Sequence, residues 1–163
     1  MPKELVINTM PLISLLAGLG NLEILPFLYS RVHVPFAVCQ EVLAGGKNNF
    51  GVSAFIQNNW LVKYTQPITI SPLLRNSLDL GEASVIGLAL QHGISLVCID
   101  EAAGRRIARL SGLDLTGTVG ILVKAKQKGY TLSVNEVLKS MRSQGIWLSD
   151  GLVQLALKKS EEL

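Results

Sequence analysis

The sequence predicts a single three-layer α/β/α domain, in which a short central parallel sheet is wrapped by helices. Short apolar segments alternate with helical segments along most of the chain, which is the pattern of a parallel sheet with crossover helices. The strand segments are nearly continuous apolar runs, as expected for strands that are buried on both faces. A chain of 163 residues fits one such domain, which is large enough to bury about two thirds of its unfolded surface.

Five segments have the length and composition of strands, and they lie at residues 5–7, 31–34, 60–64, 94–99 and 113–115. The segment at 94–99 is the clearest of them, because Gly93 ends the preceding helical pattern and Asp100 follows directly. Residues 60–64 form an edge strand or an extended connector, since Pro67 and Pro72 mark an irregular crossing after them.

Helices are predicted between these strands, and several have clear end signals. Pro11 suits the first turn of a helix that follows Asn8 and Thr9, which can cap it. Pro35 opens a helix that runs through Leu43 and that glycines then terminate. The other helices are expected at residues 53–58, 80–91, 102–110, 119–128, 134–144 and 150–159, and residues 48–51 are expected to form a loop.

The composition favours a folded protein with a buried surface between subunits. Apolar residues make up 48% of the chain and charged residues 17%, which is too apolar for disorder and somewhat poor in solubilising charge. We therefore expect a homodimer. The net charge of +3 fits either an enzyme with a neutral substrate or a weak polyanion binder, so it does not separate these classes.

The uncharged stretch at residues 5–22 resembles a signal peptide or a membrane span, but polar residues, proline and glycines interrupt it. A buried strand followed by a helix explains it better, and we predict a cytoplasmic protein without a membrane segment. Cys39 and Cys98 lie in apolar runs without metal-ligand spacing, so buried thiols are expected rather than a disulfide.

Four polar residues stand where apolar segments meet turns or helices: Asn8, Glu41, Glu82 and Asp100. Buried carboxylates need a partner, so several of them that converge from distant segments would indicate a cation site. Asn8 and Asp100 both follow predicted strands and can share the carboxyl edge of the sheet, where parallel sheets bind their ligands. Glu41 and Glu82 lie on helices that could lean over this edge.

Each candidate also has an ordinary structural explanation. Glu82 is a first-turn acid that would favour its helix dipole, and Asp100 could cap the helix that begins at residue 101 or 102. Glu101 and Asp150 are weaker candidates, and Asp150 would cap the last helix. His33 and His92 are interpreted as structural or surface residues, and neither a serine nucleophile elbow nor a dinucleotide loop is present.

Five segments, taken in order, carry a resemblance to a known family: VINTMPLISLL, VPFAVCQEVL, LGEASVIGLAL, LVCIDEAAGRRIA and LTGTVGILVKAK. Together they resemble a PIN-like nuclease domain, and specifically the PIN-like subfamily catalogued as a domain of unknown function. The resemblance implies one domain over residues 1–163, with a core at 1–128 and C-terminal helices at 129–163. It also implies that the positions of Asn8, Glu41, Glu82 and Asp100 bind Mg²⁺ or Mn²⁺, with the three acids catalytic in RNA cleavage.

Position 8 departs from the acidic pattern of the family, because asparagine offers a carbonyl oxygen without a charge. Metal affinity should fall, although an amide and three carboxylates can still hold one hard divalent ion. Met10 stands where the family commonly has a small hydroxyl residue, which would remove a hydrogen bond to the first ligand.

Basic residues follow the candidate site, and they are Arg105, Arg106, Arg109, Lys124, Lys126 and Lys128. They would bind the backbone of single-stranded or structured RNA, or else form a solvated helix face. Two functions remain open. Either the chain is a metal-dependent ribonuclease, for which the resemblance also implies the role of toxin in a toxin–antitoxin pair, or it is a non-catalytic module that binds RNA or a protein.

Overall fold

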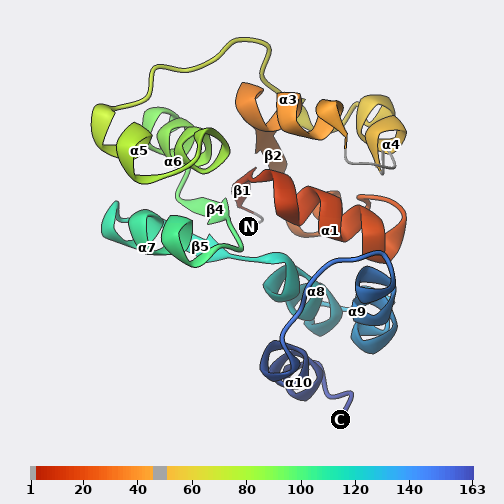
Figure 1. Ribbon diagram of the computed structural model, residues 1–163. Coiled ribbons are helices and arrows are strands. Elements are labelled where there is room, and N and C mark those ends of the chain that lie inside the picture. The colour runs from red at the N-terminus through yellow and green to blue at the C-terminus, as the bar shows by residue number, and fades with distance from the viewer. Residues whose placement is uncertain (1–2, 46–50) are drawn as a thin grey trace.

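The computed structural model describes residues 3–45 and 51–163, which form one α/β domain (Figure 1). The strands are β1 (Glu4–Ile7), β2 (Arg31–Val34), β3 (Val62–Lys63), β4 (Leu96–Cys98) and β5 (Asp114–Thr116). They form a parallel sheet in the order β3-β2-β1-β4-β5. In Figure 1, α5, α6 and α7 lie on one side of the sheet and α1, α8 and α9 on the other. The predicted fold class is confirmed.

The first half of the chain contains α1 (Thr9–Leu19), α2 (Ile24–Leu28), α3 (Phe36–Ala44), α4 (Val52–Gln57) and α5 (Pro72–Ser77). α2 and α5 were not predicted from the sequence, where the prolines indicated an irregular crossing in the region of Pro72. Instead, Pro72 is the first residue of α5, and the Ser71 hydroxyl accepts a hydrogen bond from the backbone N–H of Leu74. The expected loop at residues 48–51 lies mostly outside the described residues.

The second half contains α6 (Leu80–His92), α7 (Ala102–Leu110), α8 (Thr118–Gln127), α9 (Val134–Ser143) and α10 (Asp150–Lys159). The prediction that Asp150 caps the last helix is wrong. Ser149 is the cap, since its hydroxyl accepts from the backbone N–H of Leu152, while the Asp150 carboxylate pairs with Arg142 at 3.0 Å.

β3 and β4 are shorter than the predicted segments at residues 60–64 and 94–99, whereas β1, β2 and β5 differ from the prediction by one residue at most at either end. Ile94 donates its backbone N–H to Ala89 at the end of α6 instead of joining β4. The backbone N–H of Ile99 still donates to Thr116 at 3.1 Å, so pairing with the β5 chain continues one residue beyond β4. This last contact fixes the direction in which the chain leaves the sheet towards Asp100.

The core lies on both faces of the sheet, and β1 is at its centre. Leu5, Val6 and Ile7 have no exposed surface, as expected for a strand covered on both sides. Cys39 and Cys98 are buried free thiols, which confirms that they form no disulfide. His33 is buried between the Tyr64 hydroxyl and the Glu4 carboxylate, at 2.9 and 2.7 Å, so it is a structural residue as predicted.

A close helix contact joins α1 to α9. A Cβ atom built on Gly18 of α1 would lie 2.6 Å from Cγ1 of Val137 and 2.9 Å from Cε of Met141. Only glycine fits there without movement of the neighbouring side chains, so α9 is part of the same packed core as α1. Trp147 is 84% exposed in the monomer. Among the described residues, no helix combines the length and apolar character needed to cross a membrane.

Candidate active site

The candidate site forms at the carboxyl ends of the two central strands. β1 and β4 pair in parallel with Ile7 opposite Cys98, and the backbone N–H of Asn8 donates to the carbonyl of Cys98 at 3.1 Å. The residues that follow the two strands, Asn8 on one side and Asp100 and Glu101 on the other, therefore leave the sheet side by side. This is the edge at which parallel sheets bind ligands.

The start of α6 brings two further segments to this edge. A Cβ atom built on Gly81 would lie 2.5 Å from Oε1 of Glu41 and 3.1 Å from Oδ1 of Asn8. The glycine thus allows α6 to approach both polar side chains closely. Thr9 adds a hydrogen bond from its hydroxyl to Oε2 of Glu41 at 3.0 Å. Three of the four predicted site segments, those of Asn8, Glu41 and Glu82, therefore meet as the sequence suggested.

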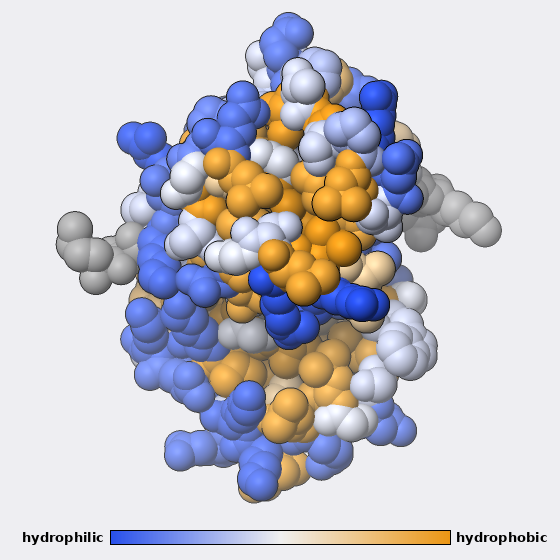
Figure 2. Space-filling model, turned by 90° about the vertical axis from the view of Figure 1, so that its left-hand side faces the viewer, coloured by the Kyte–Doolittle hydropathy of each residue, from blue (hydrophilic) through white to orange (hydrophobic). Residues whose placement is uncertain are grey.

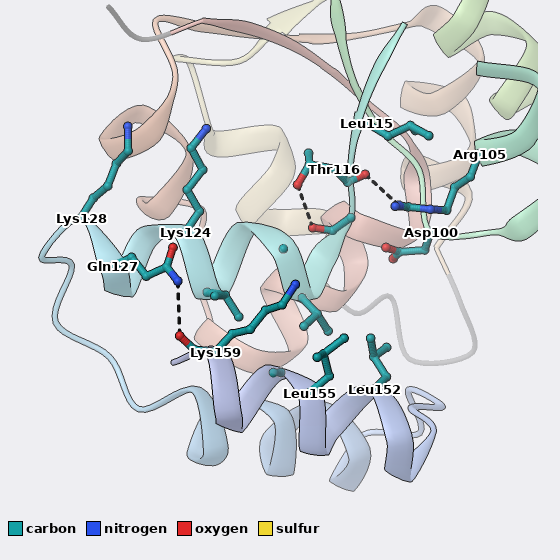
Figure 3. Close-up of a pocket in the computed structure, with 15 residues that line it drawn as sticks. Asp100, Arg105, Leu115, Thr116, Lys124, Gln127, Lys128, Leu152, Leu155 and Lys159 are labelled. Atoms are coloured by element: carbon teal, nitrogen blue, oxygen red, sulfur yellow. Dashed lines mark hydrogen bonds between the residues drawn. The ribbon is translucent and has the colours of Figure 1, made fainter. Parts of the chain in front are cut away.

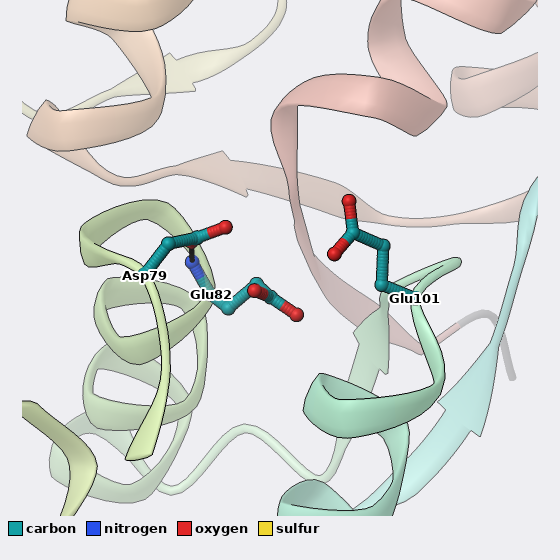
Figure 4. A group of neighbouring side chains, drawn as sticks. All are labelled: Asp79, Glu82 and Glu101. Carbon is teal, nitrogen blue, oxygen red and sulfur yellow. Dashed lines mark hydrogen bonds between the residues drawn. The ribbon is translucent and has the colours of Figure 1, made fainter. Parts of the chain in front are cut away.

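Three carboxylates gather next to them, on Asp79, Glu82 and Glu101, and one oxygen of each lies within 4.8 Å of the others (Figure 4). Asp79 is the N-cap of α6, where its Oδ1 accepts from the backbone N–H of Glu82 at 2.8 Å. Glu101 precedes α7 and makes no capping hydrogen bond with its side chain. In Figure 4 the carboxylates of α6 and of Glu101 face the space between the two helix starts.

Burial and neighbouring charge act together on Glu82. The residue is only 3% exposed, and its Oε2 has no hydrogen-bond partner among the described residues. Burial, with the charges of Asp79 and Glu101, raises the pKa of Glu82 to about 7. Oδ1 of Asn8 is likewise buried without a partner. Two buried oxygen atoms of these residues therefore lack the donor that such atoms ordinarily have.

Glu41 is affected by one of the same charges, that of Asp79, and is more exposed. Burial raises the pKa of its carboxyl group, the hydrogen bond from Thr9 lowers it, and the nearby charge of Asp79 raises it. The influence of Asp79 on Glu41 shows that the α3 and α6 carboxylates share one electrostatic environment. A bound cation would relieve the repulsion within this group.

Asp100 lies beside the group of three carboxylates and is held by α8. Its Oδ1 accepts from the backbone N–H of Thr118 at 2.8 Å, and its Oδ2 accepts from the Thr118 hydroxyl at 2.6 Å. The alternative that Asp100 caps α7 is wrong, because Glu101 occupies that position. Glu101, considered the weaker candidate, is the acid of this pair that joins Asp79 and Glu82.

Sequence reasoning missed Asp79 altogether. Its signal was available, because an aspartate three residues before Glu82 is the spacing of a helix cap. That spacing identified a helix start and gave no hint that the capping carboxylate also faces the strand ends. Glu101 adjoins Asp100, and only the path of the chain after β4 decides which of two neighbouring acids turns towards α6.

The predicted basic residues divide into two groups around α7 and α8. Arg106 and Arg109 are exposed on α7, whereas Nη1 of Arg105 donates to the backbone carbonyls of Ile99 and Thr116, at 2.8 and 3.2 Å (Figure 3). Arg105 thus braces the ends of the two strands next to Asp100. One of its nitrogens is used for this, and the rest of the guanidinium borders a cavity.

That cavity has a volume of about 1010 Å³ and lies between β5, α8 and α10. Lys124, Lys128 and Lys159 line it together with the aliphatic side chains of Leu152 and Leu155 (Figure 3). Figure 2 shows an apolar hollow in the lower half of one face, bordered by hydrophilic side chains. Lys126 points elsewhere, since its Nζ pairs with Glu162 at 2.6 Å.

The donor set fits a hard divalent cation. Carboxylate and amide oxygens are the ligands that Mg²⁺ and Mn²⁺ prefer, and this edge offers Asp79, Glu82, Glu101, Glu41 and Asn8. The unpartnered oxygens of Glu82 and Asn8 are the specific observation that supports the fit, because each is a buried oxygen ligand without a hydrogen-bond donor among the described residues. Asp100 has both oxygens engaged by Thr118 and retains lone pairs for a further contact.

A short parallel sheet with acids gathered at the carboxyl ends of its central strands is consistent with a PIN domain, a class of nuclease domain. The chain matches the model of DUF3368, a PIN-domain family, over residues 4–162, and it belongs to that family. No protein with a curated description matches it. The family resemblance predicted from the sequence is therefore confirmed, and nuclease activity with a bound metal is the function that the fold implies.

Proposed function

We propose that this PIN domain is a ribonuclease that depends on Mg²⁺ or Mn²⁺. The observation that carries the proposal is the buried, unpartnered Glu82 oxygen within a group of three carboxylates. A buried carboxylate without a partner costs stability, and a cation that coordinates it removes that cost. Asp79, Glu82 and Glu101 would hold the ion, with Glu41 and Asn8 beside them and Asp100 next to Glu101.

The metal would supply an activated water and neutralise charge on the leaving oxygen of a phosphodiester. The residues of the chain hold the components in place. Thr9 orients Glu41 through its hydroxyl, and Asp79 fixes the first turn of α6 and with it the backbone of Glu82. Arg105 braces the strand ends that carry Asp100 and Glu101.

RNA is the proposed substrate, and cations on α7 and α8, the helices that follow Asp100 and Glu101 in the chain, support the binding of a polyanion. Arg106 and Arg109 on α7, together with Lys124 in the cavity, would bind a single-stranded or structured backbone. We extend the proposal to a toxin whose activity a small antitoxin blocks. We also propose a homodimer, because the apolar side chains of Leu110 and Trp147 are 74% and 84% exposed in the monomer.

One observation favours a second function, a non-catalytic module that binds RNA or a protein. The residue after β1 is Asn8, which brings no negative charge to the metal, and Met10 beside it is 39% exposed and cannot donate a hydrogen bond. A domain that has lost tight metal binding would keep the basic surface and the fold.

The deciding experiment is cleavage of labelled single-stranded RNA, with single-stranded DNA alongside, in Mn²⁺, in Mg²⁺ and in chelator. Glu82→Gln tests the site, and Glu136→Gln on the exposed face of α9 is the matched control. Metal-dependent RNA cleavage that Glu82→Gln abolishes and Glu136→Gln retains supports the nuclease. RNA binding by folded protein without cleavage in either metal supports the binding module.

A further inference from the structure

A smaller cavity opens beside the acidic site, on the side of Glu41. Its volume is about 250 Å³, and its walls come from the start of α3, the start of α6 and the segment at residues 67–70. Glu41 is part of its lining and also part of the acidic edge, where its Oε1 approaches Gly81. A ligand in this cavity would therefore touch the site at which the proposed cleavage takes place.

The walls combine apolar surface with a few polar groups. Phe36 and Ile68 are half-buried and offer flat or branched apolar surface, while Gln40 is exposed and carries both an amide donor and a carbonyl acceptor. Cavities of about 300–1,000 Å³ enclose drug-sized ligands. This one is slightly smaller, and it suits a single planar ring system with polar atoms at its edge.

The segment at residues 65–70 supplies further polar groups. Its backbone N–H and C=O groups make no hydrogen bond with any residue that the structure describes, and Tyr64 is the last residue bonded to the sheet before it. Ile68 anchors the segment on α6, because its Cδ1 would lie 3.1 Å from a Cβ atom built on Gly87. The segment is thus placed by a side chain while its peptide groups stay available to a ligand.

We propose that this cavity binds one unpaired base of the nucleic acid, next to the phosphodiester that the acidic site would hold through its metal ion. This inference rests on the proposed function and adds a base preference to it. Apolar walls at Phe36 and Ile68 would pack against the faces of the base, as aromatic and aliphatic side chains do in single-strand binding. The amide of Gln40 and the free peptide groups of residues 65–70 would read its edge.

The test uses the four uncharged nucleosides as probes, because they carry no phosphate that the acids would repel. Each is titrated to millimolar concentration into ¹⁵N-labelled protein in chelator, and amide shifts are followed by NMR. The expected result is that at least one nucleoside shifts the backbone amides of Gln66 and residues 68–70, with Pro67 giving no amide signal, and the side-chain amide of Gln40. Phe36→Ala should lower the affinity for that nucleoside at least fivefold, while Phe27→Ala, on the exposed surface, should leave this affinity unchanged.

Gln40→Ala provides a second variant if Phe36→Ala fails to fold, since Gln40 is exposed, and it should change which nucleoside is preferred. Absence of shifts with all four nucleosides overturns the base site, as do shifts that appear only away from residues 36–41 and 66–70. An apolar peptide side chain would then be the better occupant.

RNA cleavage distinguishes this outcome from failure of the proposed function. If RNA is cleaved without base preference and no nucleoside causes shifts, the cavity does not bind a base, and the proposed nuclease function is still supported. If a nucleoside binds but RNA is not cleaved, the proposed nuclease function is contradicted, and the base-binding cavity is still supported. Where cleavage occurs, an abasic nucleotide beside the preferred bond should reduce the rate at that bond at least tenfold, and Phe36→Ala should reduce this dependence.

Discussion

At the scale of single residues, Glu82 combines the properties that define the site. We predict that Glu82→Gln abolishes Mn²⁺ binding, because the buried carboxylate is the central member of the acidic group. In chelator at pH 8 the same change should raise the free energy of unfolding by about 1–3 kcal/mol, since it removes a buried charge without a partner. Calorimetry with Mn²⁺ and urea unfolding in chelator provide the two measurements. Retained Mn²⁺ affinity would place the metal elsewhere.

A substitution of Asn8 should change the Mn²⁺ affinity in the opposite direction. Asn8→Asp adds a carboxylate where Oδ1 is buried and unpartnered beside Glu41, so Mn²⁺ affinity should increase by about tenfold as the ligand charge rises. Without metal the variant should be less stable than the parent protein, because a further negative charge joins the group. Asn21→Asp on the exposed surface is the matched control for calorimetry. Equal affinity in the two variants would remove Asn8 from the ligand set.

At the scale of elements, α7 separates a structural arginine from candidate RNA-binding ones. Arg109 is exposed in the last turn of α7, so Arg109→Ala should weaken RNA binding at low salt and reduce the slope of log K against log salt by about 0.7. Arg105→Ala should instead lower the thermal midpoint, because its guanidinium holds two backbone carbonyls. Fluorescence anisotropy at several salt concentrations gives the slope. A slope unchanged in Arg109→Ala would assign that side chain to the solvated face.

The contact of α1 with α9 gives a second prediction at this scale. Gly18→Ala should destabilise the protein by about 1–3 kcal/mol, because the new Cβ overlaps Val137 and Met141. Gly151→Ala in α10 is the control, since a Cβ there meets nothing within 4 Å and should be neutral or stabilising by about 0.5 kcal/mol. Urea unfolding measures both. A loss of equal size in the two variants would mean that helix propensity, rather than packing, sets the effect.

At the scale of the whole molecule, the sequence was sufficient for the sheet and for most of the helices. Continuous apolar runs bounded by glycine identify buried parallel strands, because few other structures have that pattern. α2 and α5 were missed, since helices of one or two turns have too little periodicity to be seen and α5 begins at a proline that also suits an irregular turn.

The candidate site was only partly accessible from the sequence for a related reason. Asn8, Glu41 and Glu82 could be placed because each stands at the end of a recognisable element. Asp79 and Glu101 join Glu82 because the starts of α6 and α7 lie together at this edge, and that placement depends on Gly81 and on the close fit of Gly104 against Glu82. No local pattern encodes such a placement.

The carboxylate of Glu162 connects the C-terminal segment to two helices of the domain. Glu162 accepts hydrogen bonds from Nζ of Lys126 in α8 at 2.6 Å and from the backbone N–H groups of Val134 and Asn135 at 2.7 and 2.9 Å. The Ser133 hydroxyl adds a bond at 3.2 Å. One side chain therefore joins the chain end to α8 and to the first turn of α9, where the helix dipole also favours negative charge.

These contacts should make the stability of the whole domain depend on acidic pH. Burial alone would raise the pKa of Glu162, but the hydrogen bonds from Lys126 and from the start of α9 outweigh it and lower the pKa to about 2. Because the folded pKa lies below the unfolded value of about 4.3, the carboxylate stabilises the fold above that value and loses this contribution as the pH falls towards 2.

Glu162→Gln should therefore cost about 1–3 kcal/mol at pH 7 and much less near pH 2. Urea unfolding at pH 7, 4 and 2.5 measures the difference, with Glu161→Gln, at the exposed neighbouring position, as the control. A cost that stays the same at all three pH values would show that the side chain acts through packing rather than through its charge.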